Sequence, residues 1–405
     1  MSSLAPSPLS GATKGPGAAS STGAAFALLL ACCAVEARKQ ADRDSFHELL
    51  HDPDWDQLLS LAEHHGITPL VYEALREHAD AVPSAILERL RRRYEDNARR
   101  NLRFTAELFR ILDCLEAHAI DAIPYKGPVL AETVYGELGR REFSDLDVIV
   151  HPADVVRARE ALKLLEYRPS LQLTHSEERA YVRSGYEYSF DGPAGANLLE
   201  IQWGIVPKFF AVDFSVEEFF ESAVHVDLAG RKVKTLSSED LLLALSVHGA
   251  KHAWIRLCWL RDISTVSQQP SLDWKFIGHQ ARELGIERIL SLSLLLASRM
   301  LRGGIPEAWQ TKLQGDARVS ELCNRIEKII SESSQYSTRS FDYFRLMLRL
   351  RERARDRVRF ALRLTLTPSI GEWSVVPLPA PLFPLYRVIR IGRLGARVFR
   401  SRAGG

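Results

Sequence analysis

Two aspartates, Asp145 and Asp147, flank a single leucine at the start of the apolar, β-branched run 148–150. Such a run predicts a buried strand, and side chains two residues apart on a strand point to the same face, roughly 6.5–7 Å from each other. Two carboxylates held that close repel each other, and burial makes an unpaired charge costlier still. The pattern therefore predicts a metal site here, rather than two solvent-facing acids on an edge strand.

A glycine turn precedes this strand. Lys126 and Gly127 follow a predicted strand at 122–125, and Pro128 opens a predicted helix that continues through Tyr135. Free backbone N–H groups at a helix N-terminus suit a phosphate, although Pro128 itself donates none. We therefore expect a phosphate-binding turn and a metal-binding strand to meet at one place.

The segments that follow predict the rest of a small mixed sheet. Pro152 is well placed to open a helix through about Leu165, because the N–H that proline lacks is unpaired at that position anyway. Two apolar runs, 186–190 and 197–203, are separated by a Gly-Pro-Ala-Gly turn and predict a hairpin. The second run carries an acid, Glu200, in its centre.

The flanking segments are predicted to be helical. Apolar residues recur at helical spacing upstream of the core, and Ser237 ahead of Glu239 and Asp240 predicts a capped helix start downstream of it. Four prolines between Pro377 and Pro384 predict an extended segment, followed by a basic tail that is either a short helix or disordered. The predicted parts are a disordered tail at 1–23, a helical N-terminal region at 24–120, the mixed-sheet core at 121–236, a helical C-terminal region at 237–364 and a Pro-rich, basic segment at 365–405.

The composition narrows the class of protein. The chain has 405 residues, 46% of them hydrophobic, so it can bury a sizeable core. Its five cysteines form neither a disulfide framework nor a metal-ligand pattern, which favours a reducing, cytoplasmic location. A net charge of +2 creates no global field that demands a nucleic-acid partner. No apolar run approaches the roughly 20 residues of a transmembrane helix.

Two local features leave alternatives open. The apolar stretch that ends at Cys32 resembles a lipoprotein cleavage box, but it is short and follows a single basic residue, Lys14, so a first core helix is the preferred interpretation. Arginines gather in the last sixty residues. A solvated helix face is the preferred interpretation there, with anionic lipid or RNA as the alternative partners.

The glycine turn, the helix and the Asp-x-Asp strand together resemble the polymerase β nucleotidyltransferase superfamily. Within it, the chain resembles a bacterial family of uncharacterised nucleotidyltransferases designated type 5, from about Trp55 to Arg390. This resemblance implies an α+β fold, with a small mixed-sheet polymerase β-like nucleotidyltransferase core flanked by helical N-terminal and C-terminal regions. The residues that carry it are Lys126-Gly127, Leu130-Ala131, Tyr135, Arg141, Asp145-Leu146-Asp147, Glu200-Ile201-Gln202-Trp203 and His248-Gly249-Ala250-Lys251-His252-Ala253-Trp254.

The resemblance also implies the catalytic site. A third carboxylate on a neighbouring strand completes the metal site in that superfamily, and Glu200 is the best-placed acid. Asp145, Asp147 and Glu200 would hold two Mg²⁺ ions, and Glu200 would assist deprotonation of the acceptor. The family usually carries His two residues after this acid, whereas this chain has Gln202.

The nucleotide-binding residues follow from the same resemblance. Gly127, Arg141 and Lys251 are expected to hold the phosphates of a nucleoside triphosphate, the two cations by neutralising phosphate charge. Lys126 is expected either to reach the triphosphate as well or to pair with the acidic cluster. Ser144 has no assigned role.

A second motif lies on one helical face. Three residues follow His248 at helical spacing: Lys251 three residues on, His252 four and Arg256 eight. Two histidines at i and i+4 can bind zinc, but the HExxH motif is absent, so structural histidines are expected instead. The resemblance implies that Trp254 and Trp259 pack against the catalytic sheet, and we expect Arg261 and Asp262 to form an ion pair.

The implied function is a metal-dependent nucleotidyltransferase. It would move a nucleoside monophosphate from a nucleoside triphosphate to an unidentified acceptor, in the first instance a small molecule or biosynthetic intermediate, and release pyrophosphate. A non-catalytic nucleotide-binding scaffold or accessory protein of a peptide or polysaccharide biosynthesis pathway is the alternative. RNA modification ranks last, because the chain has no recognised RNA-binding motif.

Overall fold

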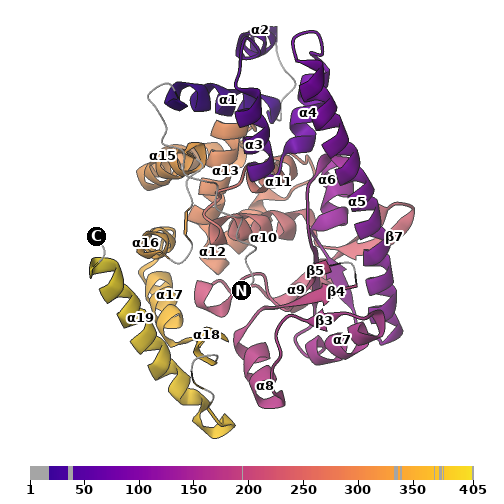
Figure 1. Ribbon diagram of the computed structural model, residues 1–405. Helices are drawn as coiled ribbons and strands as arrows, with labels where there is room; N and C mark the ends of the chain where they lie inside the picture. Colours follow the sequence, from indigo (N-terminus) through magenta and orange to yellow (C-terminus); the bar gives the residue numbers. More distant parts are fainter. Residues whose placement is uncertain are drawn as a thin grey trace.

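The computed structural model describes residues 18–34, 40–193, 195–332, 336–337, 340–368, 370–373, 376 and 378–403 (Figure 1). Most of the tail predicted to be disordered, residues 1–17, lies outside this part of the chain, and a helix begins at Ala18. The predicted fold class, α+β with a small mixed sheet flanked by helical regions, is confirmed. No helix in the described part of the chain is long and apolar enough to cross a membrane.

A five-stranded mixed sheet forms the centre of the core. Its middle pair, β2 and β5, is parallel, and every other neighbouring pair is antiparallel. All five residues of β2 are buried, Asp147 among them, as the apolar run 148–150 predicts for this strand. The predicted hairpin is confirmed, because β4 and β5 pair across the Gly192–Gly195 turn. In spatial order the strands are β1 (Ala122–Pro124), β2 (Leu146–Val150), β5 (Gly195–Gln202), β4 (Glu187–Gly192) and β3 (Arg168–Pro169).

Short helices and a separate hairpin complete the core. The predicted helix Gly127–Tyr135 is confirmed as α6. The helix after β2 begins at Val155 rather than Pro152, which lies in a turn, so the proline precedes this helix instead of opening it. The remaining elements are η1 (Leu138–Arg140), α7 (Val155–Leu162), η2 (Lys163–Leu165), α8 (His175–Ser184), η3 (Lys208–Phe210), α9 (Val216–Ser222) and the hairpin of β6 (Val224–Leu228) and β7 (Arg231–Thr235).

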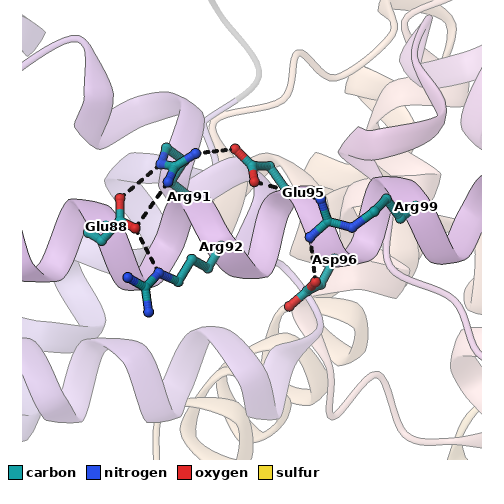
Figure 2. Close-up of polar contacts among 6 residues, drawn as sticks. All are labelled: Glu88, Arg91, Arg92, Glu95, Asp96 and Arg99. Atoms are coloured by element: carbon teal, nitrogen blue, oxygen red, sulfur yellow. Dashed lines mark hydrogen bonds and ion pairs between the residues drawn. The ribbon is translucent and has the colours of Figure 1, made fainter.

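Among residues 18–34 and 40–121, which the structure describes, the helices ahead of the sheet are α1 (Ala18–Cys32), α2 (Gln40–Leu49), α3 (Trp55–His65), α4 (Thr68–Arg76) and α5 (Ser84–Ala117). The last of them, α5, has 34 residues and runs along one edge of the molecule (Figure 1). Its exposed face carries a ladder of ion pairs three and four residues apart, drawn in Figure 2: Glu88 with Arg91 and Arg92, Glu95 with Arg91 and Arg99, and Asp96 with Arg99. Each such exposed pair contributes about 0.3–0.5 kcal/mol, so the ladder supports the helix but does not hold it in place.

The opposite face of α5 packs against the sheet. Leu108, Ile111 and Leu115 belong to the same buried cluster as Val148 and Val150 of β2. Apolar burial of this kind, rather than the surface ion pairs, fixes the helix to the core.

The first helix after the sheet starts where the sequence predicts. Ser237 caps α10, and its hydroxyl accepts a hydrogen bond from the N–H of Asp240 at 3.2 Å. The extended conformation predicted for the Pro-rich segment is wrong for Ala380–Leu385, which forms the 3-10 helix η4, because proline has a φ that suits the first turn of a helix. The helices are α10 (Ser238–Lys251), α11 (Leu257–Ser267), α12 (Trp274–Leu284), α13 (Glu287–Leu301), α14 (Glu307–Gly315), α15 (Ala317–Ser331), α16 (Phe341–Arg349), α17 (Ala354–Leu366), α18 (Ile370–Trp373) and α19 (Tyr386–Ala403).

The two faces of β2 are buried in different clusters. Leu146, Val148 and Val150 pack with α5 and α7, whereas Ile149 belongs to the cluster that contains α10, α11 and α13. Because side chains alternate along a strand, Asp147 shares the face of Ile149. The sequence pattern thus directs the aspartates of this strand toward the C-terminal helices.

One buried histidine is expected to make the fold sensitive to acid. His65 on α3 is fully buried, and neither ring nitrogen has a hydrogen-bond partner among the described residues. Burial, together with the charges of His64 and Arg256, lowers the pKa of His65 to about 3. The unfolded chain therefore binds a proton that the folded one does not, and stability that is complete above about pH 6.5 is lost as the pH falls toward 3.

We expect the substitution His65→Phe to remove much of this loss, which should reach about 2 kcal/mol at pH 5. The free energy of unfolding should be measured by urea titration at pH 7 and pH 5, with the exposed His225→Gln as the control. An equal pH dependence in the wild-type protein and in His65→Phe would contradict the prediction.

Candidate active site

The parallel pairing of β2 and β5 brings two predicted carboxylates together. Asp147 and Glu200 are direct partners in the register of these strands. Paired residues of neighbouring strands point to the same face of a sheet, and Asp145, two residues before Asp147, lies on the approach to that face. The three acids, which come from two segments 53 to 55 residues apart, therefore lie along one edge of the sheet face that looks toward the C-terminal helices.

A hydrogen-bonded network joins the acids to a lysine and an amide. The side-chain amide of Gln202 donates to Asp147 Oδ1 at 2.8 Å and to Glu200 Oε2 at 3.0 Å. The hydroxyl of Tyr125 donates to the side-chain oxygen of Gln202, Oε1, at 2.9 Å, which fixes the orientation of the side-chain amide. Lys126 Nζ donates to Asp147 Oδ1 at 3.0 Å in an ion pair that is almost entirely buried.

The electrostatics of these acids show an excess of negative charge. Burial, together with the charges of Glu187, Asp147 and Asp145, raises the pKa of Glu200 to about 8. Burial and the charge of Asp147 likewise raise the pKa of Asp145 to about 6. A single lysine is thus insufficient to compensate the cluster, and a further cation bound there would be stabilised.

The histidine motif of α10 faces the same place. Lys126 Nζ lies 3.4 Å from His248 Nδ1, and the rings of His248 and His252 contact each other and Trp259. Burial, together with the neighbouring lysines, lowers the pKa of both histidines well below its ordinary value. The histidines therefore stay neutral, as expected for structural residues.

Lys251 lies beside the sheet, whereas Trp254 packs away from it. Lys251 Nζ donates to the hydroxyl of Tyr186, just before β4, at 3.0 Å, so its ammonium lies beside the sheet. Trp254, which the resemblance placed against the sheet, instead donates through its indole N–H to Ser293 on α13 at 3.0 Å and covers Gly249. A Cβ at Gly249 would lie 2.7 Å from the indole, so this close approach between the turn and α10 requires glycine.

Arg141 is held by an acid on a distant helix. Its guanidinium donates two hydrogen bonds to Asp262 on α11, both at 2.9 Å, and the hydroxyl of Tyr135 donates to the same carboxylate at 2.6 Å. The expected pair between Arg261 and Asp262 is therefore wrong, and Arg261 donates to the carbonyl of Cys33 instead. Arg141 Nη1 is buried without a hydrogen-bond partner among the described residues.

The glycine of the turn is required by its backbone. Gly127 has a φ of +54°, a conformation that costs other residues about 1–2 kcal/mol. A Cβ there would also lie 3.4 Å from the carbonyl oxygen of Asp145. The turn that opens α6 is thus packed directly against the start of the Asp strand, and no side chain of the described residues caps α6.

Two asparagines of α5 that the sequence analysis missed position this loop. Asn97 donates to the carbonyls of Gly139 and Arg141 at 2.9 and 3.2 Å, and Asn101 donates to those of Leu138 and Arg141 at 2.6 and 2.8 Å. The signal was present in the sequence, since two amides four residues apart precede Leu108 on the buried stripe of a long helix. Buried amides need partners, and a nearby loop is the usual source of free carbonyls.

The donor set fits Mg²⁺ in type and charge. The three carboxylates are hard oxygen donors, and the raised pKa values of Glu200 and Asp145 reflect the uncompensated charge that a divalent cation neutralises. In the described residues, however, no group of three or more His, Cys, Asp or Glu side chains has the spacing of a metal site. Lys126 and Gln202 both bind Asp147 Oδ1, and these contacts are where a bound cation would compete.

A surface pocket of about 450 Å³ lies elsewhere, among α2, α3 and the loop before α5. Its lining includes His47, His51 and Trp55 but none of the predicted site residues.

Comparison with known proteins identifies the family. No curated protein matches the chain. The crystal structure of an antigenic nucleotidyltransferase-like protein from Paracoccidioides brasiliensis is weakly similar, with 17% identity, a TM-score of 0.28, and coverage of 50% of this chain and 93% of that one. Residues 51–302, which include the whole sheet and the histidine motif, match the profile of a family described as uncharacterised nucleotidyltransferases. The chain belongs to this family of nucleotidyltransferases.

Proposed function

We propose that the protein is a Mg²⁺-dependent enzyme that transfers a nucleoside monophosphate from a nucleoside triphosphate to a small-molecule acceptor and releases pyrophosphate. The observation that carries the proposal is the direct pairing of Asp147 with Glu200, with Asp145 two residues upstream. Mg²⁺ held by these three carboxylates would neutralise the charge on the phosphate oxygens during in-line displacement.

Three cationic groups beside the acids are suited to the triphosphate. Lys126 lies between Asp147 and His248. Arg141 keeps one buried N–H group, Nη1, without a partner among the described residues, and a phosphate oxygen would satisfy it. Lys251 is paired only with the neutral hydroxyl of Tyr186 in the contacts that the structure records, so its charge is available to an anion.

Glu200 is suited to accept the proton of the acceptor. Its carboxylate pairs with Asp147 across the parallel strands and so lies where an acceptor bound beside the acids would present its proton. The attacking group would be a hydroxyl, a phosphate or a similar nucleophile. The acceptor is unidentified, and a biosynthetic intermediate is the class we propose to search first.

Transfer of label tests the proposal. The full chain would be incubated with each α-³²P-labelled nucleoside triphosphate, Mg²⁺ and a metabolite extract, and the products separated into small-molecule, protein and RNA fractions. We expect Mg²⁺-dependent label in the small-molecule fraction, together with pyrophosphate. Tight nucleotide binding by calorimetry without pyrophosphate release would instead support the non-catalytic scaffold, and label in RNA would support RNA modification.

Gln202 is expected to position the carboxylates. The substitution Gln202→Leu removes the donor shared by Asp147 and Glu200 and leaves the buried hydroxyl of Tyr125 unpaired, so we expect a loss of about 1–3 kcal/mol in the free energy of unfolding. Turnover should fall by about 10–100-fold, as is typical when the partner of a metal ligand is removed. Gln202→His, which can still donate, should retain more activity. Equal activity in the Leu variant and the wild-type protein would contradict this role.

A further inference from the structure

Exposed apolar side chains are concentrated at the C-terminal end of the protein. Fourteen large hydrophobic residues of the described chain are exposed, and nine of them lie between Phe341 and Ile391. Scattered exposed apolar residues need no explanation, but a concentration of them marks an interaction surface.

These residues form two stripes on neighbouring elements. On α17, Val358, Leu362 and Leu366 follow each other every four residues and are 57%, 53% and 41% exposed. Along η4 and α19, the residues at every third position from Leu382 to Ile391 are 44–65% exposed. Both spacings keep one side of a helix apolar. We name these two stripes, with the exposed Arg355 and Arg387, the C-terminal surface.

The helix α19 is held in place by contacts on its inner side. α19 packs on α17 and α18 and runs along the edge of the molecule opposite α5 (Figure 1). On its inner side, Arg390 donates to the carbonyl of Leu364 and to Glu372, and Arg393 also pairs with Glu372. The hydroxyl of Tyr386 donates to the carbonyl of Val376 and accepts from the N–H of Leu378, both at 2.9 Å. The apolar stripe on the outer side is thus presented by an anchored helix.

The charge of this segment is strongly positive. Residues 353–403 contain eleven arginines, no lysine and two acidic residues, and α19 contains six arginines and no acid. Glu372 pairs with arginines on the inner side of α19, and Asp213 pairs with arginines of α17. Arg355 and Arg387 are exposed. A helix with an apolar face and basic flanks has the chemistry that binds at the interface of an anionic bilayer.

We propose that the C-terminal surface docks the protein on an anionic lipid membrane, with α19 lying in the plane of the interface. The apolar stripes would enter the acyl boundary while the arginines contact phosphate headgroups. RNA is the less suitable partner, because exposed Val, Leu and Ile contribute little to a polar nucleic-acid interface, which uses aromatic stacking and phosphate contacts. The proposal does not depend on the chemistry at Asp147.

Vesicle co-sedimentation of the full chain tests the proposal. We expect binding to vesicles that contain phosphatidylglycerol, little binding to phosphatidylcholine alone, and weakening by salt. The double substitution Val388→Asp/Ile391→Asp should weaken binding by at least about tenfold, and Arg387→Ala by about fivefold. The matched control is Leu164→Asp, which places the same charge at a residue that is 71% exposed outside this surface and should leave binding unchanged.

Four results would overturn the proposal. They are a failure of the wild-type chain to bind anionic vesicles at low salt, an equal loss in the Leu164→Asp control, binding to an RNA oligonucleotide that outcompetes the vesicles, and a dimer in sedimentation experiments that the double variant dissociates. The last would assign the surface to a second copy of the chain. Circular dichroism and transferase activity in solution should be the same in the double variant as in the wild-type protein, because the substituted side chains are exposed.

Discussion

Replacing Asp147 with asparagine is expected to lower the rate of nucleotidyl transfer by at least about 1,000-fold, which corresponds to about 4 kcal/mol of transition-state stabilisation. The substitution keeps the oxygen that accepts hydrogen bonds from Lys126 and Gln202 but removes the negative charge. Without that charge the proposed Mg²⁺ site loses its central ligand, the one that faces Glu200 across the parallel pair.

Pyrophosphate release from each nucleoside triphosphate would measure this effect, and calorimetric titration with Mn²⁺ would measure cation affinity independently of turnover. The matched control is Asp80→Asn, a substitution of an exposed aspartate. Circular dichroism should show that Asp147→Asn remains folded, because its hydrogen bonds are retained. Turnover and Mn²⁺ affinity within a few-fold of the wild-type values would refute the assignment of Asp147 as a metal ligand.

The substitution Asp262→Ala is expected to cost about 3–5 kcal/mol in the free energy of unfolding. Asp262 is 1% exposed and accepts hydrogen bonds from Arg141 and Tyr135, and its removal leaves a buried guanidinium without a counter-charge. Burial alone would lower the pKa of Arg141, but the charge of Asp262 holds it above its ordinary value. The arginine therefore cannot escape the cost by losing its proton.

Urea unfolding of three variants separates this cost from a general effect of losing an ion pair. The exposed pair of Arg89 and Asp56 supplies the control, and Asp56→Ala should cost less than about 1 kcal/mol. The double substitution Arg141→Met/Asp262→Leu removes both charges and should be less destabilising than Asp262→Ala, because no unpaired charge remains buried. Equal costs for Asp262→Ala and Asp56→Ala would contradict the prediction.

Much of the core could be predicted because its signals are local. The Asp strand, the glycine turn, α6 and the β4–β5 hairpin each follow from spacing within a short segment. Two wrong assignments of secondary structure involve proline: Pro152 lies in a turn ahead of α7, and residues 380–385 of the Pro-rich segment form η4. Proline fixes φ but leaves open whether a turn, a helix start or an extended chain follows, and packing makes that choice.

Less of the site could be predicted. Pattern alone singled out Asp145 and Asp147, whereas Glu200 was chosen by family resemblance. The bonds that organise the site join residues far apart in the chain: Lys126 to His248, Gln202 to Tyr125, and Arg141 to Asp262, which is 121 residues away. No spacing rule connects such residues, because their contact depends on how the helices after the sheet pack onto it.

By itself, then, the sequence determined that the run containing Asp147 is a buried strand, that a glycine turn and a helix precede it, and that a hairpin follows it. Those properties depend on side-chain alternation and on local steric limits, which act within a few residues. Only the tertiary structure decided that β2 and β5 pair in parallel with Asp147 opposite Glu200, that Arg141 is held by Asp262, and that Trp254 packs away from the sheet. These choices follow from burying several apolar faces at once, a condition that no single segment can meet alone.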